Sequence, residues 1–445
     1  MASLAKIFSS TSSYAYDDLI LMPGYVDGPL EEISLQCRLT PSISLALPIV
    51  ASPMDTVTSP ELAIALALQG GIGIIHVNQT IEEAVDMVRK VKRFHNGIIH
   101  CPVTVEAGWS VGKVKGLQED LGFTGFPVKD DEGLVMGMVS RRDMDFADED
   151  APVSSVCVTG EDLVFGLDDE PFDLLVDRLK RHKVSRLPIL SAKEPGRLKG
   201  LICRKDIRVR ALHPEATMDS QNHLRVGAAI TTHPGDQDRV TALFEAGVDV
   251  LVIDSSNGAS CYQLEMLRWI HATHPSLEVI CGNVVTVDQG RLLLESGAAA
   301  LRVGMGVGSI CTTQDVCGVG RGQASAVYHL ANLVRTTYKD RGLIADGGIS
   351  SSGKIIKALA LGATCVMLGS MLAGTDEAPG DYFVKDGVRV KTYRGMGSIA
   401  AQRHQGSRVR YSGSSRMPSC LVAQGVSGTV TSKGPIASYI PSLSR

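Results

Sequence analysis

The feature of this chain that most restricts its fold is a repeated pairing of two patterns. A short apolar run of strand length is followed each time by a segment with apolar residues three and four positions apart. That order is typical of parallel βα units. The apolar runs are 48–52, 72–76, 226–230, 248–254, 277–283, 299–304, 343–347 and 364–370, and the helical patterns include 60–69, 81–91, 263–272 and 327–338. Eight such units predict an α/β protein built as a closed (β/α)8 TIM barrel.

Polar residues and glycines stand where the apolar runs end. In barrels of this kind, binding and catalytic residues gather at the C-terminal ends of the strands. The run ends carry Ser52, Met54, Asp55, His76, Asp254, Ser255, Ser256, Asn283, the segment 304–311, Asp346, Gly347, Gly348, Gly369 and Ser370. A plain turn explains any one glycine pair equally well. Their convergence on one rim predicts a site, with a phosphate bound after the seventh and eighth strands.

Cys311 is the candidate nucleophile because it lies in the glycine-rich run Gly-Met-Gly-Val-Gly-Ser-Ile-Cys at 304–311. A thiol reacts as its thiolate, which backbone N–H groups and cations favour and apolar burial disfavours. The alternative is a small hydrophobic core residue, the interpretation that we prefer for Cys203, Cys281 and Cys365. No CxxC or Cys/His metal spacing occurs in the chain.

Composition excludes several classes of function. The 445 residues suffice for one large domain and a smaller one. A formal net charge of −4 argues against a nucleic-acid partner. No apolar stretch approaches the ~18 residues of a membrane span, and residues 1–13 lack the apolar core of a secretory signal. We therefore expect a cytoplasmic protein without a membrane partner.

The segment 95–214 breaks the barrel rhythm and contains an internal repeat. Gly-Phe-Pro-Val at 125–128 precedes Ser-Arg-Arg-Asp, which ends at Asp143, and Arg-Leu-Pro-Ile at 186–189 precedes Cys-Arg-Lys-Asp, which ends at Asp206. This tandem pair resembles cystathionine-β-synthase (CBS) repeats, whose acidic residue at the helix start contacts the ribose of a regulatory nucleotide. Asp143 and Asp206 are thus candidate ligands of purine nucleotides, although aspartate is also a common helix-capping residue. The expected organisation is barrel at 1–96, CBS pair at 97–215 and barrel again at 216–445.

The remaining motifs resemble the IMP dehydrogenase / GMP reductase family over nearly the whole chain. They lie at 17–24, 52–56, 70–73, 304–314, 345–348, 393–398 and 422–426. The resemblance implies that Cys311 attacks C2 of the hypoxanthine ring of inosine 5′-monophosphate (IMP). Hydride then passes to NAD and leaves a covalent thioimidate of xanthosine monophosphate. It also implies a homotetramer, with pairing into octamers left open.

The resemblance assigns the site residue by residue. Substrate would contact Ser52, Met54, Ser309, Asp346, Gly347, Gly348, Gly369, Ser370, Tyr393, Gly395, Met396, Gly397 and Gln424. NAD would contact Asp254, Ser255, Ser256, Asn283, Gly304 and Gly306, and the backbone carbonyls of Gly306, Gly308 and Cys311 would bind potassium, for which carbonyl oxygen is a suitable hard ligand. Thr313, Arg410, Tyr411 and Gln424 complete the catalytic set.

Two long segments carry the last expectations. The Cys loop covers 304–323, and residues 373–430 are too long for a barrel loop, which predicts an active-site flap. Within the flap, Arg410 and Tyr411 would activate the water that hydrolyses the thioimidate. The alternative interpretation is a solvated basic patch with Arg403, Arg408 and Arg416.

Departures from the family pattern keep three functions open. Thr312 and the run Gly-Val-Gly at 318–320 favour a reductase, whereas Gln314, Arg410-Tyr411 and Gln424 favour a dehydrogenase. Val307 stands where a serine often touches substrate. The chain ends at Arg445, where both enzyme types continue and supply part of a neighbour's cation site. The candidates are IMP oxidation with NAD, GMP reduction with NADPH, and a catalytically weak scaffold that binds purine nucleotides.

Overall fold

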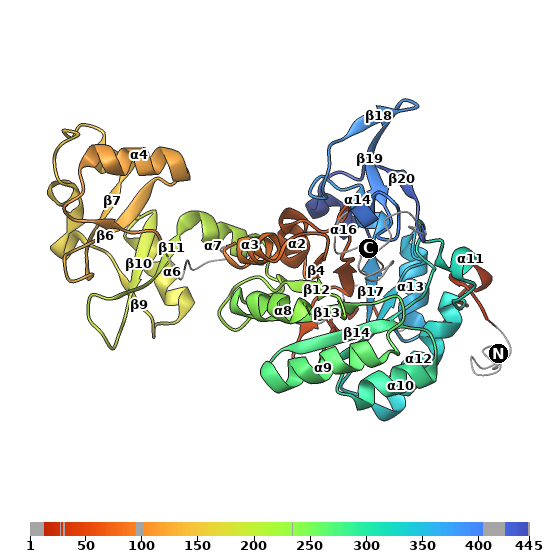
Figure 1. The fold of residues 1–445 in the computed structure, drawn as a ribbon. Coiled ribbons are helices and arrows are strands. Elements are labelled where there is room, and N and C mark those ends of the chain that lie inside the picture. Colours follow the sequence, from red (N-terminus) through yellow and green to blue (C-terminus); the bar gives the residue numbers. More distant parts are fainter. Residues whose placement is uncertain are drawn as a thin grey trace. The chain divides into compact units, whose positions relative to one another are not determined.

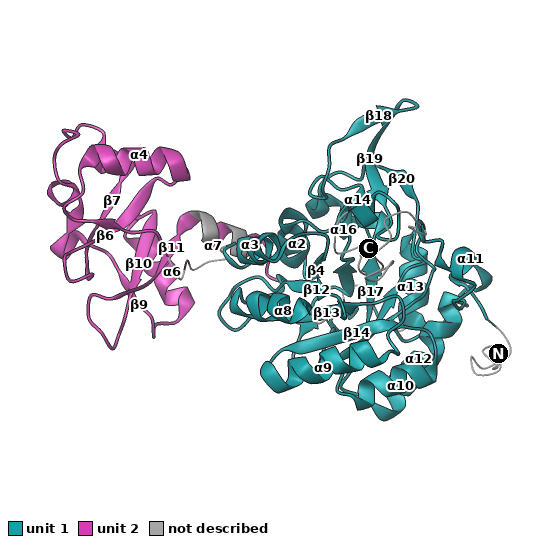
Figure 2. Ribbon diagram, in the orientation of Figure 1, with its two compact units in different colours: residues 1–94, 215–445 teal, residues 95–214 magenta. Residues whose placement is uncertain are grey.

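The computed structural model describes residues 13–26, 28–29, 32–94, 99, 102–233, 235–403 and 423–443. The chain forms two compact units, shown in Figure 2. The barrel unit comprises residues 1–94 and 215–445, and the insert unit comprises residues 95–214.

The barrel unit contains a closed barrel of eight parallel strands in the order β12-β13-β14-β15-β16-β17-β3-β4 (Figure 1). Each strand overlaps one of the eight apolar runs, so the predicted TIM barrel is confirmed. The strands are β3 (Ile49–Ala51), β4 (Ile72–Ile75), β12 (Gly227–Ile230), β13 (Val250–Asp254), β14 (Glu278–Val284), β15 (Ala300–Val303), β16 (Gly342–Asp346) and β17 (Cys365–Leu368).

Helices connect the strands and begin at residues suited to that role. Ser59 accepts a hydrogen bond from Leu62 N at the start of α2, where Pro60 is the first helical residue. Thr80 and Glu83 form a capping box at the start of α3. The described barrel helices are α2 (Pro60–Leu68), α3 (Ile81–Lys92), α8 (Asp236–Glu245), α9 (Cys261–Thr273), α10 (Val287–Glu295), α11 (Thr313–Cys317), α12 (Gln323–Thr337), α13 (Ser352–Ala360), α14 (Ser370–Ala373) and α16 (Ile436–Leu443).

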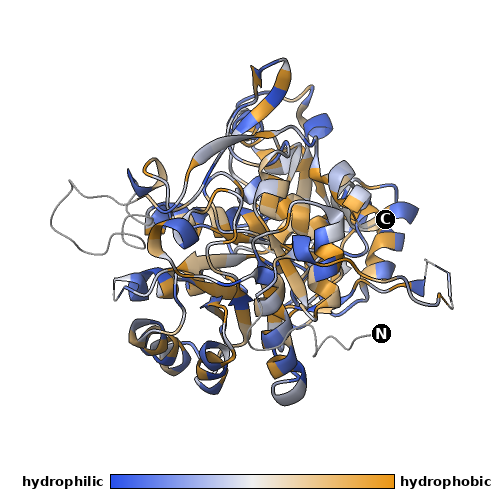
Figure 3. Cartoon of the chain, turned by 90° about the vertical axis from the view of Figure 1, so that its right-hand side faces the viewer, coloured by the Kyte–Doolittle hydropathy of each residue, from blue (hydrophilic) through white to orange (hydrophobic). Residues whose placement is uncertain are grey.

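Side chains fill the barrel, which is therefore a packed core. Alternate strand residues such as Val50, Ile74, Val252 and Ile344 point inward and are fully buried. Hydrophobic segments gather toward the interior of this unit in Figure 3. Among the helices that the structure describes, none combines the length and apolar character needed to cross a lipid bilayer.

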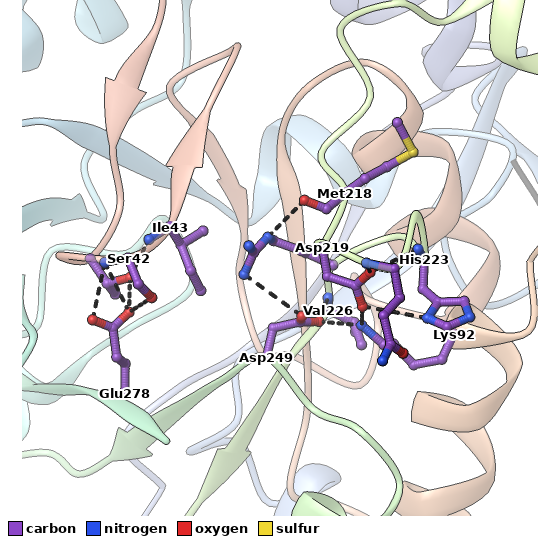
Figure 4. Close-up of polar contacts among 12 residues, drawn as sticks. Ser42, Ile43, Lys92, Met218, Asp219, His223, Val226, Asp249 and Glu278 are labelled. Atoms are coloured by element: carbon purple, nitrogen blue, oxygen red, sulfur yellow. Dashed lines mark hydrogen bonds and ion pairs between the residues drawn. The ribbon is translucent and has the colours of Figure 1, made fainter. Parts of the chain in front are cut away.

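A hairpin covers the N-terminal end of the barrel. Its strands are β1 (Cys37–Arg38) and β2 (Ser44–Leu45), and Leu39, Ile43 and Leu45 join the interior cluster. The Glu278 carboxylate, at the start of β14, accepts hydrogen bonds from the hydroxyls of Thr40 and Ser42 (Figure 4). These bonds fix the hairpin to the barrel strands.

The insert unit contains two copies of one element order, strand-helix-strand-strand-helix. In each copy the first strand pairs parallel to the second, and the second pairs antiparallel to the third. The first copy has β5 (Val105–Glu106), α4 (Val111–Leu121), β6 (Gly125–Lys129), β7 (Val135–Ser140) and α5 (Arg141–Met144). The second has β9 (Gly166–Leu167), α6 (Phe172–Arg181), β10 (Arg186–Leu190), β11 (Leu198–Cys203) and α7 (Arg204–Leu212). Strand β8 (Val158–Thr159) completes the first sheet.

The predicted flap segment is anchored by an antiparallel sheet. Strands β18 (Phe383–Lys385), β19 (Val388–Arg394) and β20 (Ser427–Thr431) pair in the order β18-β19-β20. Tyr393 faces Gly428 in this register. Residues 404–422, which include Arg410 and Tyr411, lie outside the described residues.

Candidate active site

A pocket of about 480 Å³ opens at the C-terminal ends of the barrel strands. That volume is in the range of small-molecule sites. Its lining includes Ser52, Met54, Ser255, Ser256, Asn283, Gly304, Gly306, Gly308, Ser309, Cys311, Thr313, Asp346, Gly347, Gly348, Gly369, Ser370, Tyr393, Gly395, Met396, Gly397 and Gln424. Of the predicted catalytic, substrate, cofactor and metal residues that the structure describes, only Asp254 is absent from this lining.

Cys311 lies in a tight turn beside the pocket. Its backbone N–H donates to the carbonyl of Gly308 at 2.9 Å, which closes the turn. Its Sγ lies 3.2 Å from the Thr313 hydroxyl, and the side chain is only partly buried. The thiol is therefore accessible and has a hydroxyl neighbour.

The chain that returns from the flap pairs with the Cys loop. Cys311 and Gly425 form an antiparallel bridge, and Val426 N donates to Ile310 O at 2.9 Å. This pairing places the Gln424 carbonyl oxygen 3.7 Å from Sγ and its side-chain Oε1 3.4 Å from the Thr313 hydroxyl. Residues 113 positions apart thus meet at the nucleophile.

Glycines allow the backbone to turn tightly at the pocket floor. Gly347 and Gly348 have φ values of +92° and +74°, which side-chain-bearing residues rarely adopt. At Gly304 a Cβ would lie 2.0 Å from the Asp346 carbonyl oxygen. The floor can therefore present its N–H groups to a bound anion, as the position after the seventh strand predicts.

Tyr393 lines the same pocket. Its side chain is buried, and its hydroxyl approaches the Met54 sulfur at 3.8 Å. Burial raises the pKa of the Tyr393 phenol to about 12, and a hydrogen bond with Ser309 acts in the opposite direction. The hydroxyl therefore stays protonated near neutral pH and can donate to a ligand.

A chain of ion pairs links three barrel strands at the pocket, which two of its residues, Arg302 and Asp346, line. Arg302 pairs with Asp254 through Nη1, and its Nε lies 2.9 Å from Asp346 Oδ2. Asp254 is 1 % exposed and belongs to this chain of ion pairs, and its contact with NAD stays a prediction. The carboxylates of Asp254 and Asp346 together balance the buried Arg302 guanidinium.

Asn283 and Gln323 hold the turns around Asp346. Asn283 Nδ2 donates to the Gly304 carbonyl at 2.7 Å and to Asp346 Oδ2 at 2.9 Å. Gln323 Nε2 donates to the carbonyls of Val303 and Asp346 at 2.8 and 3.0 Å. These amides orient the Asp346 side of the pocket.

A second ion pair fixes the flap sheet to the barrel rim. The Arg394 guanidinium contacts Asp55 through Nε at 3.1 Å and Nη2 at 2.7 Å, and Asn78 donates to the same carboxylate at 2.9 Å. Burial acts to raise the pKa of Asp55, but the hydrogen bonds from Arg394 and Asn78 outweigh it and hold that pKa below its ordinary value. We call this pair the Asp55–Arg394 clasp. Asp55 follows Met54 and Arg394 follows Tyr393 in the sequence, so the clasp adjoins two residues that line the pocket.

The candidate regulatory residues take local roles where they are described. The Asp143 carboxylate accepts hydrogen bonds from the backbone N–H and the hydroxyl of Ser140, both at 2.7 Å, at the start of α5. It thus occupies the third helical position of a capping box, which is the helix-capping role given above as the alternative to ligand binding. The side chain of Asp206 lies outside the described part of α7.

Three features of the site were not predicted from the sequence: Arg302, Gln323 and the partnership of Asp55 with Arg394. Arg302 carried a usable signal, because an arginine inside the apolar strand run 299–304 must find buried partners. The other two carried none, since their partners lie 23 and 339 positions away.

Comparisons with known proteins identify the family of the chain. The model of the IMP dehydrogenase / GMP reductase domain matches residues 13–445. The inosine-5′-monophosphate dehydrogenase of Toxoplasma gondii is 47% identical over 405 residues, which cover 89% of this chain and 72% of that protein. The enzyme of the same name from Schizosaccharomyces pombe is 42% identical over 438 residues, covering 96% and 82%.

A solved structure supports the same assignment. It is a cysteine-to-alanine variant of GMP reductase from Trypanosoma brucei in complex with guanosine 5′-monophosphate, with 33% identity and a TM-score of 0.87. The match covers 98% of this chain and 90% of that one. The chain therefore belongs to the IMP dehydrogenase / GMP reductase family.

Proposed function

We propose that this protein oxidises IMP to xanthosine 5′-monophosphate with NAD as the hydride acceptor. The observation that carries the proposal is the position of the Cys311 thiol at the rim of the pocket, with Thr313 and Gln424 beside it. The curated relatives named inosine-5′-monophosphate dehydrogenase support the direction of the reaction.

The substrate phosphate binds at the glycine turns and Tyr393. Gly347 and Gly348 supply backbone donors, Ser309 and Ser370 supply hydroxyls, and the protonated Tyr393 phenol supplies a further donor. The base lies against Met54, Met396, Gly397 and Gln424. This arrangement brings C2 of the purine toward the Cys311 sulfur, which forms the covalent bond.

The residues near Asn283 suit NAD. Ser255 and Ser256 line the same pocket after β13, and their hydroxyls can bind ribose or amide groups. NAD supplies the hydride-accepting nicotinamide when it is bound. The protein's part is to hold C2 next to that ring and keep the Asp346 side rigid through Arg302 and Asn283.

Hydrolysis of the covalent intermediate requires an activated water. We assign this step to Arg410 and Tyr411 of the flap, with Thr313 as partner. The described ends of the flap support the assignment, because β19 leads from the pocket and residues 424–426 return to Cys311.

GMP reduction remains the second candidate. The structural match to a GMP reductase and the Gly-Val-Gly run at 318–320 favour it. One assay separates the two. IMP with NAD should yield NADH and xanthosine monophosphate, whereas GMP with NADPH should yield neither cofactor oxidation nor ammonia. Rapid NADPH oxidation with GMP and no NADH from IMP would reverse the assignment, and purine binding without either reaction would favour the scaffold.

The backbone carbonyl oxygens of the Cys loop are chemically suited to bind a potassium ion. The carbonyls of Gly306, Gly308 and Cys311 belong to one loop, in which the bond from Cys311 N to Gly308 O closes the turn 308–311. Carbonyl oxygens are suitable ligands for a hard monovalent cation. Turnover should therefore be higher in potassium chloride than in choline chloride at equal ionic strength, and equal rates would argue against the site.

Assembly and regulation complete the proposal. Ile20, Met22 and Tyr25 are 88%, 77% and 92% exposed, an apolar run that a second copy of the chain would cover in a homotetramer. Light scattering of the purified chain tests this, and a monomer would refute it.

The tandem repeats of the insert unit resemble CBS pairs, so we assign purine nucleotides to them. Calorimetric titration of the chain with ATP and GTP checks that assignment.

A further inference from the structure

Two cysteines face each other at the end of the barrel opposite Cys311. Cys37 lies in β1 of the covering hairpin, and Cys365 is the first residue of β17. Their Sγ atoms are 3.4 Å apart, and both are free thiols. Neither residue lines the pocket. The apolar run around Cys365 predicts an inert core cysteine, which does not explain a second sulfur at this distance.

The two thiols differ in access and in acidity. Cys365 is 0% exposed, and burial raises the pKa of its thiol well above the ordinary value. Cys37 is only partly buried, and the hydrogen bond with Cys365 lowers the pKa of its thiol despite burial. Cys37 is thus the more accessible and the more acidic thiol of the two, and Cys365 is the protected one.

The surroundings hold the pair together. The Arg38 guanidinium donates to the Lys339 carbonyl at 2.9 Å, and the Arg38 carbonyl lies 3.6 Å from Cys365 Sγ. On the other side of the hairpin, Ser42 donates to Glu278 (Figure 4). A disulfide needs about 2.05 Å between sulfurs, so they must approach by only about 1.4 Å.

We propose that Cys37 and Cys365 are a peroxide-sensitive pair that closes into a reversible disulfide. The Cys37 thiolate attacks one peroxide oxygen, the O–O bond breaks, and Cys37 becomes a sulfenic acid as one water leaves. The Cys365 sulfur then attacks the Cys37 sulfur, the S–O bond breaks, and the Cys365 proton leaves with the hydroxyl as a second water. Two thiols and one hydrogen peroxide thus give one disulfide and two waters, and a dithiol reverses the reaction.

The disulfide would link the covering hairpin covalently to β17, the eighth barrel strand. It would join residues 328 positions apart, and a cross-link over so long a loop removes much of the freedom of the unfolded chain. The oxidised protein should therefore resist unfolding more than the reduced protein. The proposal does not depend on the reaction assigned to Cys311.

The test uses the full chain and hydrogen peroxide. After a few-fold molar excess of peroxide, catalase quench and alkylation, peptide mapping should find the peptides of Cys37 and Cys365 joined, with a loss of 2 Da that dithiothreitol restores. The midpoint of thermal unfolding should rise by a few degrees on oxidation. Cys37→Ser should show neither the link nor the rise. Cys261→Ser, which removes an exposed cysteine, should keep both.

A further variant tests the order of events. In Cys365→Ser, Cys37 lacks its resolving partner and should accumulate as a sulfenic acid that dimedone traps. The proposal is overturned if Cys37 and Cys365 both remain alkylatable in the wild type while Cys261 is oxidised. It is equally overturned if Cys37 becomes sulfinic acid without any link to Cys365, an outcome that does not require Cys365→Ser to fold.

Discussion

At the residue scale, the pocket depends on one reactive atom. Replacing Cys311 by alanine removes the sulfur but leaves the glycine turns and Tyr393 in place. We expect Cys311→Ala to lose turnover completely while still binding IMP with an affinity within about tenfold of the wild type. Calorimetric titration and the NADH assay together check this. Substantial turnover in the variant would show that another group forms the covalent bond.

At Gly369 the constraint is steric, because the space beside it does not admit a side chain. Its φ of −106° suits any residue, but a Cβ there would lie 2.7 Å from the Tyr393 hydroxyl and 3.3 Å from the Met54 sulfur. Gly369→Ala should displace Tyr393, raise the KM for IMP about tenfold or more, and destabilise the fold by about 1–3 kcal/mol. Gly353→Ala is the matched control, because its nearest atom is 4.0 Å away and the residue lies in α13. An equal KM for IMP in the two variants would contradict the steric explanation.

At the element scale, the Asp55–Arg394 clasp joins β19 to the loop after β3. The Asp55 side chain is 7% exposed and that of Arg394 is 24% exposed, so solvent screens their attraction only in part. A double-mutant cycle with Asp55→Asn and Arg394→Gln should give a coupling of about 1.5–3 kcal/mol. The exposed pair Lys90–Glu61 should give less than about 1 kcal/mol. Similar couplings for both pairs would contradict the buried character of the clasp.

The clasp also predicts a pH dependence of stability. The folded-state pKa of Asp55 is lowered, so the unfolded chain takes up its proton first as the pH falls. The stabilisation is fully present above the ordinary aspartate pKa of about 4 and is lost as the pH falls through the lowered value. The difference in unfolding free energy between the wild type and Asp55→Asn should therefore be constant from pH 6 to 7 and shrink below about pH 4. A difference that grows toward acid would refute the assignment.

The flap provides the third element-scale prediction. Hydride transfer needs Cys311 and the bound dinucleotide, whereas hydrolysis needs the group that activates water. General-base assistance is worth about 10²–10⁴-fold, so Arg410→Ala should slow steady-state turnover by that factor. Stopped-flow mixing with IMP and NAD should still give a burst of NADH near one per site, with a nucleotide trapped on Cys311. Loss of the burst as well would assign Arg410 to binding or folding.

At the scale of the whole molecule, the barrel unit fixes the segment where the chain leaves for the insert unit and the segment where it returns. Lys92, the last residue of α3, contacts Asp219 and Asp249 at 2.9 Å each (Figure 4). Burial raises the pKa of Asp249, and Lys92 acts against that rise. This cluster ties the chain before the insert to the chain after it within one compact unit.

Removal of the insert should therefore leave the catalytic unit folded. We expect a protein in which a short Gly/Ser linker replaces residues 103–212 to keep turnover within about threefold of the full chain, since the barrel strands and rim lie outside this segment. The same deletion with Lys92→Met should unfold at a lower temperature, because two partly buried carboxylates lose their cation. A folded deletion protein without any activity would show that the insert contributes directly to catalysis.

The sequence by itself determined the barrel and the positions along the chain that face its pocket. Strand length, helical spacing and glycines needing positive φ are local properties, so the eight units and the Gly347–Gly348 turn were predictable from neighbours alone. The repeat in 95–214 was predictable for the same reason, because each copy forms its own strands and helices.

The tertiary structure alone decided which polar groups became partners. Asp254 pairs with Arg302, because closing the barrel buries that arginine and its charge requires nearby carboxylates. Cys37 meets Cys365 only because the hairpin covers the end at which β17 begins. Gln424 reaches Cys311 only because the flap returns to pair with the Cys loop. Such pairings depend on the closure of the fold over hundreds of residues, which no local pattern encodes.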